Sequence, residues 1–296
     1  MPTRRLIFAM SDFTSPFFIC LTKLTLFLLL LSLGLTVNLK QVMCLWQRPG
    51  LLNRAIWGIS VATPILAIAI GVGMNLPVEA KVGLVIVSIS PGTSLPWHYF
   101  VKTFKGHLYA GALQTTTAFL AIVTVPITLA IVNEFMPADV RIAPLAVAQQ
   151  LLVFQLLPLV IGITLQQFHL ALLERNTKRL MTMTAGLLYA LLIWALGQQF
   201  NILLQVGMRS IAAIGLLALL SLWIGHWLGG REIATRTLLA LTLTTHNIAL
   251  ALFIAATNLP NVAILPTIAI YVLMSVGLEI AYSRWNQPRL DTTISG

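Results

Sequence analysis

Nine long apolar runs determine what this chain can fold into. Each approaches the ~20 residues that a helix needs to cross the hydrocarbon core of a bilayer. We expect transmembrane helices at about residues 17–37, 52–74, 80–103, 107–133, 144–168, 178–199, 206–228, 233–257 and 261–284. Lipid offers no partners to backbone N–H and C=O groups, so such segments fold as helices. The sequence therefore predicts an all-α polytopic membrane protein with a single domain over residues 1–296.

The composition agrees with this class and excludes several functions. The chain is 58% hydrophobic and 9% charged, whereas soluble domains have about 25% charged residues. The net charge of +10 comes from basic residues scattered singly over short loops, so it predicts no nucleic-acid partner. No nucleophile–base pair, phosphate loop or metal-ligand spacing is present, so we expect neither an enzyme nor a resident cofactor or metal.

The positive charges predict an orientation in the membrane. In a nine-span arrangement, twelve lysines and arginines lie on the side of the C-terminus and five lie on the other side. Because basic loops stay in the cytoplasm, we expect a multi-pass protein of the plasma membrane with its N-terminus outside. Lys23 falls inside the first span near its outer end, where its amine can reach the interface.

The third span contains a break at membrane depth. The run "KVGLVIVSIS" continues into "PGTSLPWHYF", where proline and glycine replace the apolar residues of a spanning helix. Proline removes a backbone donor and clashes with the preceding turn. Irregular backbone survives there only where protein or trapped water covers it. We therefore predict a substrate-binding role for Ser90, Pro91, Gly92, Thr93 and Ser94.

A second polar interruption lies in the middle of the eighth span, "TLLALTLTTHNIALALFIAATN". The amide of an asparagine needs several partners in an apolar medium, so we assign Thr244, Thr245, His246 and Asn247 to the same site. The alternative for the threonines is that they bond to carbonyls of their own helix. His246 either carries a proton or an anion, or is a neutral side chain held by the neighbouring hydroxyls.

Paired interruptions at matching places in two halves of a chain are typical of secondary transporters with inverted repeats. Here spans 1–4 form one half and spans 5–9 the other, and each broken helix is the penultimate span of its half. Two breaks that meet would form a polar cavity open to each side in turn. Glu279 lies inside the last span, near its cytoplasmic end. Its carboxylate either has a role at the site, pairs with a basic group, or reaches interfacial water, and we favour the last of these.

Several segments resemble the bile acid:sodium symporter family. They are "FLLLLSLGLTVNLKQVMCLWQRPGLL", "VGLVIVSISPG", "IVTVPITLAI" and "TLTTHNIALALFIA", in the family's order, and the resemblance extends over about residues 24–284. It implies a divergent nine-span member that lacks the family's first helix. It further implies a panel of helices at about 17–37 and 144–199, a core at about 52–133 and 206–284, and an organic anion as substrate.

The sequence departs from the family where sodium would bind. Thr242 stands at the place of the family's glutamate, and Ile59 at the place of a glutamine, while Thr115 or Thr117 keeps a hydroxyl near a ligand position. Thr242, Thr115, Thr117 and His246 are therefore the candidate ion ligands. Coupling to Na+, coupling to H+ and uncoupled transport all stay open. The alternative function is a non-transporting membrane binding protein or accessory subunit on the same scaffold, and the oligomeric state is not predicted.

Overall fold

The computed structural model describes residues 15–37, 39–92, 109–168, 171–198, 200–260 and 262–294, and within these ranges the chain forms helices and no strand. Eight of its helical segments are long and apolar enough to cross a membrane. The third expected span, at 80–103, is described only in its first part, where it ends as a helix at Ser88. The polytopic all-α class is confirmed, whereas a full count of nine spans is not.

The described residues of the first half form six α-helices. Their bounds, with the short turns that join them, are α2 (Pro16–Thr36), α3 (Leu39–Trp46), α4 (Pro49–Trp57), η1 (Gly58–Ala62), α5 (Thr63–Gly73), α6 (Val78–Ser88), α8 (Tyr109–Val132), η2 (Asn133–Phe135) and η3 (Ala138–Val140). The segments α4, η1 and α5 run on without interruption and form the second span, Pro49–Gly73.

The described residues of the second half form eight α-helices and one wide π-helical turn. These are α9 (Pro144–Leu151), η4 (Leu152–Leu156), α10 (Leu157–Gln167), α11 (Ala171–Gln198), α12 (Phe200–Leu203), α13 (Met208–Leu228), α14 (Ile233–Thr244), α15 (Ile248–Asn258) and α16 (Leu265–Ile294). The last helix continues well past the predicted end at residue 284. The eighth span is divided into α14 and α15, as the polar interruption predicts.

Prolines explain several local features of these helices. Pro16, Pro49 and Pro144 each lie in the first turn of a helix, where the missing N–H would have had no partner. The wide π-helical turns η1 and η4 each come directly before a turn that contains a proline, Pro64 or Pro158. Proline cannot donate to the preceding turn, and a widened turn accommodates its ring.

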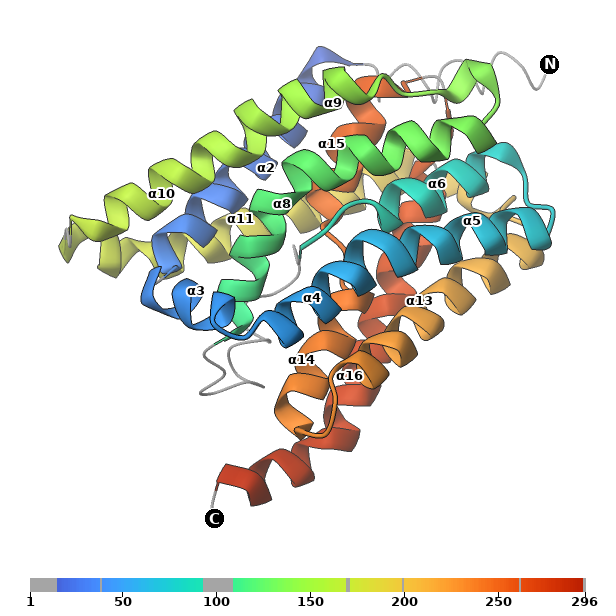
Figure 1. Cartoon of the computed structure of the whole chain (residues 1–296). Helices are drawn as coiled ribbons and strands as arrows, with labels where there is room; N and C mark the ends of the chain where they lie inside the picture. The colour runs from blue at the N-terminus through green and yellow to red at the C-terminus, as the bar shows by residue number, and fades with distance from the viewer. Residues whose placement is uncertain are drawn as a thin grey trace.

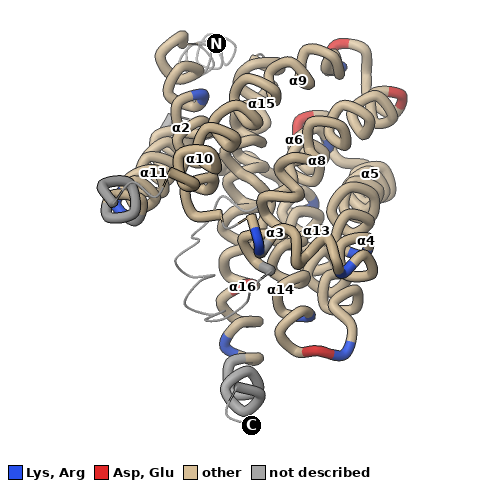
Figure 2. The backbone as a smooth tube through the Cα atoms, turned by 60° about the vertical axis from the view of Figure 1, so that its left-hand side comes forward, with Lys and Arg blue, Asp and Glu red and all other residues tan. Residues whose placement is uncertain are grey.

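Glycines allow a close crossing of α2 and α10. Gly34 of α2 faces Gly162 of α10, and a Cβ at Gly34 would lie 2.5 Å from the carbonyl oxygen of Leu159 and 2.9 Å from the Gly162 Cα. Small residues of this kind let helix backbones approach closely in a membrane. In both views α2, α10 and α11 lie together on one side, whereas α4, α5 and α13 lie on the other (Figures 1 and 2). The division into a panel and a core stays a prediction.

The α14–α15 segment is the most enclosed part of the molecule. All residues in its most apolar stretch are buried inside the protein (100%). In the seven other candidate spans, only 28% to 56% of the corresponding stretch is buried. It is bordered by α13 and α16 and also by α2 and α6. The polar interruption therefore lies among protein side chains on every side.

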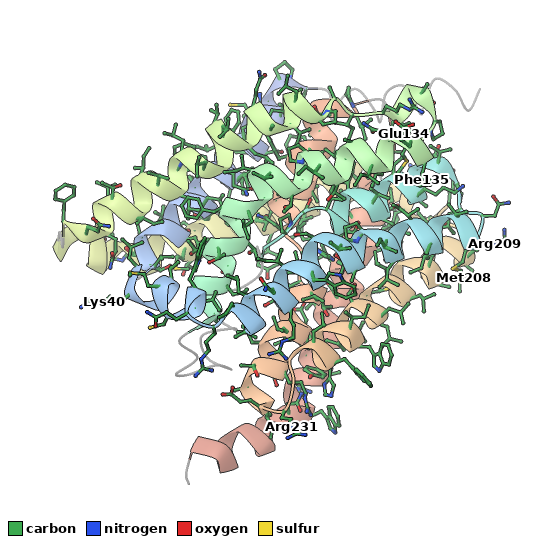
Figure 3. The ribbon with its side chains drawn as sticks, in the orientation of Figure 1. Lys40, Glu134, Phe135, Met208, Arg209 and Arg231 are labelled. Carbon is green, nitrogen blue, oxygen red and sulfur yellow. The ribbon has the colours of Figure 1, made fainter. Side chains whose placement is uncertain are left out.

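Charged side chains mark the two ends of the helices. Lysines, arginines and acidic residues lie mainly at the helix ends and in the connections between helices (Figure 2). Glu134 and Arg209 lie at one end, whereas Lys40 and Arg231 lie toward the other (Figure 3). The structure thus places Lys40 and Arg231 on one side and Arg209 on the opposite side, as the predicted alternation of spans requires.

Candidate functional site

The first helix break follows Ser88 at the end of α6. Ile89 leaves the helical conformation, the Ser90 N–H still donates to the Val87 carbonyl at 3.1 Å, and Pro91 has no N–H to continue the pattern. Gly92 has a φ of +107°, a backbone conformation that residues with a Cβ rarely adopt. The Pro-Gly pair therefore ends α6 abruptly and turns the chain at a fully buried place, since Ser90 is 0% exposed.

The second break separates α14 from α15 at Thr245, His246 and Asn247. Asn247 is the N-cap of α15, and its Oδ1 accepts a hydrogen bond from the Leu250 N–H at 3.0 Å. Asparagine is among the strongest N-cap residues because its side chain satisfies a donor that the helix cannot. The break is therefore encoded by a residue that begins a new helix.

The two breaks meet. The backbone N–H of Asn247 donates to the carbonyl oxygen of Ser90 at 2.9 Å, and a Cβ at Gly92 would lie 3.8 Å from the Asn247 Cβ. An interrupted helix leaves carbonyls at its C-terminal end and N–H groups at its N-terminal end without intrahelical partners. Here one group of each kind satisfies the other, so each break supports its counterpart.

Hydroxyl groups around the breaks bond to their own helices. Ser90, Thr242, Thr244 and Thr245 each donate to the carbonyl four residues earlier, at 2.7 to 2.8 Å. This is the self-bonding alternative considered for the threonines. It leaves the oxygen lone pairs of these side chains as acceptors, so the hydroxyls remain possible ligands for a cation or a donor.

Helix α16 contributes two side chains that contact the second break. The Tyr271 hydroxyl donates to the Thr244 carbonyl at 2.8 Å, and the Thr245 Oγ1 lies 2.6 Å from the Glu279 Oε1. The Tyr271 ring also lies 5.5 Å from the His246 ring. The expectation that Glu279 reaches interfacial water is wrong, because this side chain is only 8% exposed and faces Thr245.

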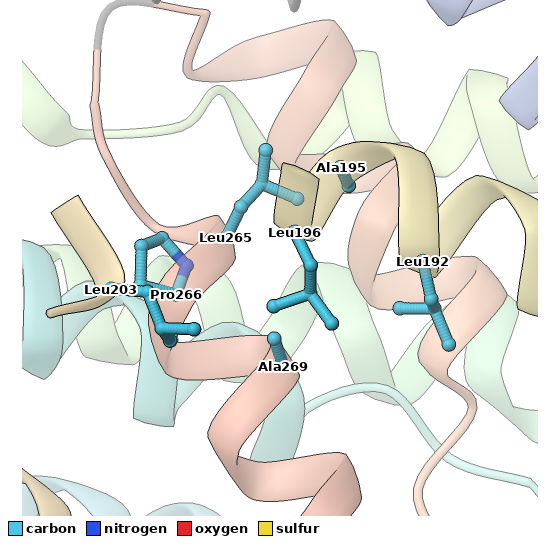
Figure 4. Close-up of a pocket in the computed structure, with 7 residues that line it drawn as sticks. All are labelled: Leu192, Ala195, Leu196, Leu203, Leu265, Pro266 and Ala269. Carbon is cyan, nitrogen blue, oxygen red and sulfur yellow. The ribbon is translucent and has the colours of Figure 1, made fainter. Parts of the chain in front are cut away.

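One small cavity lies beside the first break, and another lies farther away. Pro91 borders one, together with Ser60, Thr124 and Thr128, and it has room for about one water molecule. The other is apolar and lies between α11, α12 and the start of α16, with Leu192, Leu203 and Pro266 in its wall (Figure 4). It lies along the seam where the predicted panel meets the predicted core.

Away from the break, α15 is tied to α9 and η4. The side chains of Gln150 and Asn258 exchange two amide hydrogen bonds, of 3.2 and 3.1 Å. Nearby, the Phe154 and Phe253 rings lie 5.3 Å apart, and the Lys23 amine stands 5.4 Å from the Phe154 centroid. We call this group of contacts the α15 clasp. It joins α9 and η4 to the C-terminal half of α15.

Some predicted residues are not part of this arrangement. Thr93 and Ser94 lie outside the described residues. Thr115 and Thr117 are buried in α8, and the Thr117 hydroxyl donates to the Gln114 carbonyl at 3.0 Å. Among the hydrogen bonds of the described residues, none joins Thr115 or Thr117 to either break. The remaining predicted residues, from Ser90 to Gly92 and from Thr242 to Asn247, lie at the breaks or in the turn before them.

Sequence reasoning missed Tyr271 and Thr63 and misjudged Glu279. Thr63 donates to the Ile59 carbonyl at 2.8 Å and lies 3.4 Å from the Ser88 carbonyl, which links η1 to the first break. An isolated tyrosine in "TIAIYVLMSV" was the available signal for Tyr271, because a buried phenol needs a hydrogen-bond partner. A carboxyl group within an apolar span was the signal for Glu279.

Comparison with known proteins shows which family this chain resembles. Residues 23–206, more than half of the chain, match the model of the Sodium Bile acid symporter family. This region includes the first break and stops before the second. The chain is also 27% identical over 208 residues to a protein of Oryza sativa subsp. japonica described as "Probable sodium/metabolite cotransporter BASS2, chloroplastic". That alignment covers 68% of this chain and 47% of the rice protein.

Proposed function

Because this chain belongs to the sodium bile acid symporter family, we propose that it is a secondary transporter of a small organic anion that works by alternating access. Members of this family are transporters rather than enzymes. The observation that most supports the proposal is the hydrogen bond between Asn247 and Ser90, which joins the end of α6 to the interruption between α14 and α15, from opposite halves of the chain. In secondary transporters, interrupted helices of matching halves form the binding site near the bilayer midplane.

The polarity of the helix ends supports an anionic solute together with a cation. The first turn of α15 presents the positive end of a helix dipole, and the last turn of α14 presents a negative end. Asn247 and Thr245 lie at these two ends, only two residues apart. A cation that binds at the end of α14 would lower the energy of an anion that binds beside α15. Such mutual stabilisation is the physical basis of symport.

The substrate path in this proposal is the seam between panel and core. Helices α2, α10 and α11 would form the panel with α9, while α14 and α15 would belong to the core. The α15 clasp closes the seam at one end, so we propose that this conformation is closed toward that side. Alternating access then requires the Gln150–Asn258 pair to separate in the opposite conformation.

The coupling ion is Na+ or H+ in this proposal. The family is named for sodium, but Thr242 lacks the carboxylate of the family pattern and its hydroxyl bonds to the Leu238 carbonyl. We also propose a plasma-membrane location with the N-terminus outside and the C-terminus in the cytoplasm. The rice relative is described as chloroplastic, so the membrane in question has to be determined for this chain itself.

Flux measurements in proteoliposomes test the transport proposal. Radiolabelled taurocholate and short-chain carboxylates are the probes, and uptake is compared under inward Na+, K+ and H+ gradients. Uptake above protein-free liposomes, stimulated by one of the Na+ and H+ gradients, is the expected result. Saturable binding of a probe without flux would instead identify a non-transporting binding protein.

A further inference from the structure

The buried carboxyl group of Glu279 has no charged partner among the described residues. It is 8% exposed, and no lysine or arginine of the described part of the chain forms an ion pair with it. An isolated carboxylate is costly to bury in a membrane protein, so it needs a counter-charge or a bound proton. Its only hydrogen-bond partner found in the structure is the Thr245 hydroxyl, 2.6 Å away.

The number of protons around Thr245 identifies the donor of this contact. The Thr245 Oγ1 lies 2.8 Å from the Leu241 carbonyl oxygen and 2.6 Å from the Glu279 Oε1. A threonine hydroxyl has one proton, whereas a carbonyl oxygen and an ionised carboxylate only accept. If Glu279 were ionised, two acceptors would compete for a single proton. A proton on Glu279 satisfies both contacts, because Thr245 then donates to Leu241 and accepts from Glu279.

We infer that Glu279 is a proton-binding site, in which the carboxyl group donates a hydrogen bond to the Thr245 hydroxyl at the break between α14 and α15. The carboxyl O–H bond breaks when the proton leaves to water and re-forms when it returns, so one proton and one charge move per event. The site lies on α16, a helix on which the sequence predicted no ion ligand. Its role in a transport cycle rests on the proposed function, whereas the presence of the proton does not.

The elements packed against this part of α16 carry several other titratable and charged groups. Within the described residues, these are His246 just after α14, Arg236 of α14, Arg179 and Tyr189 of α11, Arg209 and His226 of α13, Tyr271, Tyr282 and Arg284 of α16 itself, and Glu79 and Lys81 in the first turn of α6. His226 is engaged with the Tyr282 hydroxyl at 2.6 Å. Helix α15 has no titratable side chain.

A route for the proton follows from the place of Glu279 at the panel–core seam. Helix α11 packs against α16, and the side chain of its Tyr189 is 40% exposed. A shift of α11 away from α16 would therefore uncover the carboxyl group to water. A shift at the break itself would remove the Thr245 hydroxyl. Either motion links proton release to the movement that alternating access requires.

Infrared spectroscopy of the purified full-length protein tests the inference without any substrate. A protonated carboxyl group gives a carbonyl stretch separate from that of a carboxylate, and the chain has only eight acidic side chains. We expect a protonated-carboxyl band at neutral pH in the wild type that is absent in Glu279→Gln. The exposed Glu134, at the edge of the molecule (Figure 3), supplies the control: Glu134→Gln retains the band. A wild type without the band would overturn the inference.

A second variant tests the hydrogen bond itself. Thr245→Val removes the hydroxyl and retains the carboxyl group, so we expect the band to shift while Glu279→Gln abolishes it. A band that stays in place in Thr245→Val would contradict the assigned contact. In proteoliposomes, Glu279→Gln is expected to lose uptake driven by a pH gradient. If no solute moves in the wild type, the proposed function fails, whereas the infrared band still decides whether Glu279 binds a proton.

Discussion

Replacing Asn247 by alanine tests the arrangement of the two breaks most directly. The substitution removes the Oδ1 atom that caps α15 and leaves the Leu250 N–H without its partner in a buried place. Loss of an N-cap costs about 1 kcal/mol in exposed helices, and a buried N–H without a partner costs about 1–3 kcal/mol. These figures describe the same bond, so we expect a loss of about 2 kcal/mol.

The measurement is thermal unfolding of the purified protein in detergent, followed by tryptophan fluorescence. By the scaling for soluble domains, about 2 kcal/mol corresponds to a decrease in Tm of roughly 4–8 °C. Asn247→Ser is the matched control because serine caps a helix nearly as well as asparagine, so its Tm should stay close to that of the wild type. The backbone bond from residue 247 to Ser90 is present in all three proteins.

Two results would refute this reasoning. An alanine variant as stable as the wild type would mean that the cap contributes nothing to the break. A serine variant as unstable as the alanine variant would mean that the amide group, rather than the cap, is what the site requires. In that second case, flux measurements on both variants would show whether the amide binds solute.

Three further predictions concern the packing around the site. Gly162→Leu should lower stability by about 1–3 kcal/mol because a side chain there overlaps the backbone of α2. Gly186→Ala, on an open face of α11, should raise stability by about 0.5–1 kcal/mol. A higher Tm for Gly162→Leu than for Gly186→Ala would exclude the close crossing. Tyr271→Phe removes the hydroxyl that bonds to the end of α14 and should cost about 1 kcal/mol in the same assay, and an unchanged Tm would argue against that bond. With the two native cysteines replaced, cysteines at 150 and 258 joined by a short cross-linker should stop solute flux until the linker is cleaved, because the α15 clasp must open; undiminished flux after complete cross-linking would contradict alternating access through this seam.

The helix breaks were predictable because their causes are local. Pro91 and Gly92 cannot continue a helix whatever surrounds them, and the polar residues through Asn247 have no place in an apolar span without partners. The partner of each break was not predictable. The bond from Asn247 to Ser90 joins residues that lie more than 150 positions apart in the sequence, and only the packing of α6 against α15 brings them together.

Glu279 shows why the depth of a residue in a span does not determine its environment. From position alone, a carboxyl group near a helix end is expected to extend toward the interface. The structure instead turns this side chain toward Thr245, because α16 packs against α14 at that level. Side-chain direction depends on which face of α16 meets its neighbours, and an apolar helix with few polar residues gives little indication of that face.

The complete enclosure of α14 and α15 has a consequence for how the protein is made. The most apolar stretch of this segment is completely buried in the final structure. Two backbone groups of its central turn, the Asn247 N–H and the Thr244 carbonyl, lack their partners until α6 and α16 are in position. Such a segment is a poor candidate for stepwise release from the insertion machinery. Because α16 is synthesised after α14 and α15, these two helices can reach their final packing only after α16 has been made. Late events in translation therefore complete this membrane domain, and a truncation that removes α16 should leave the preceding segments open to degradation.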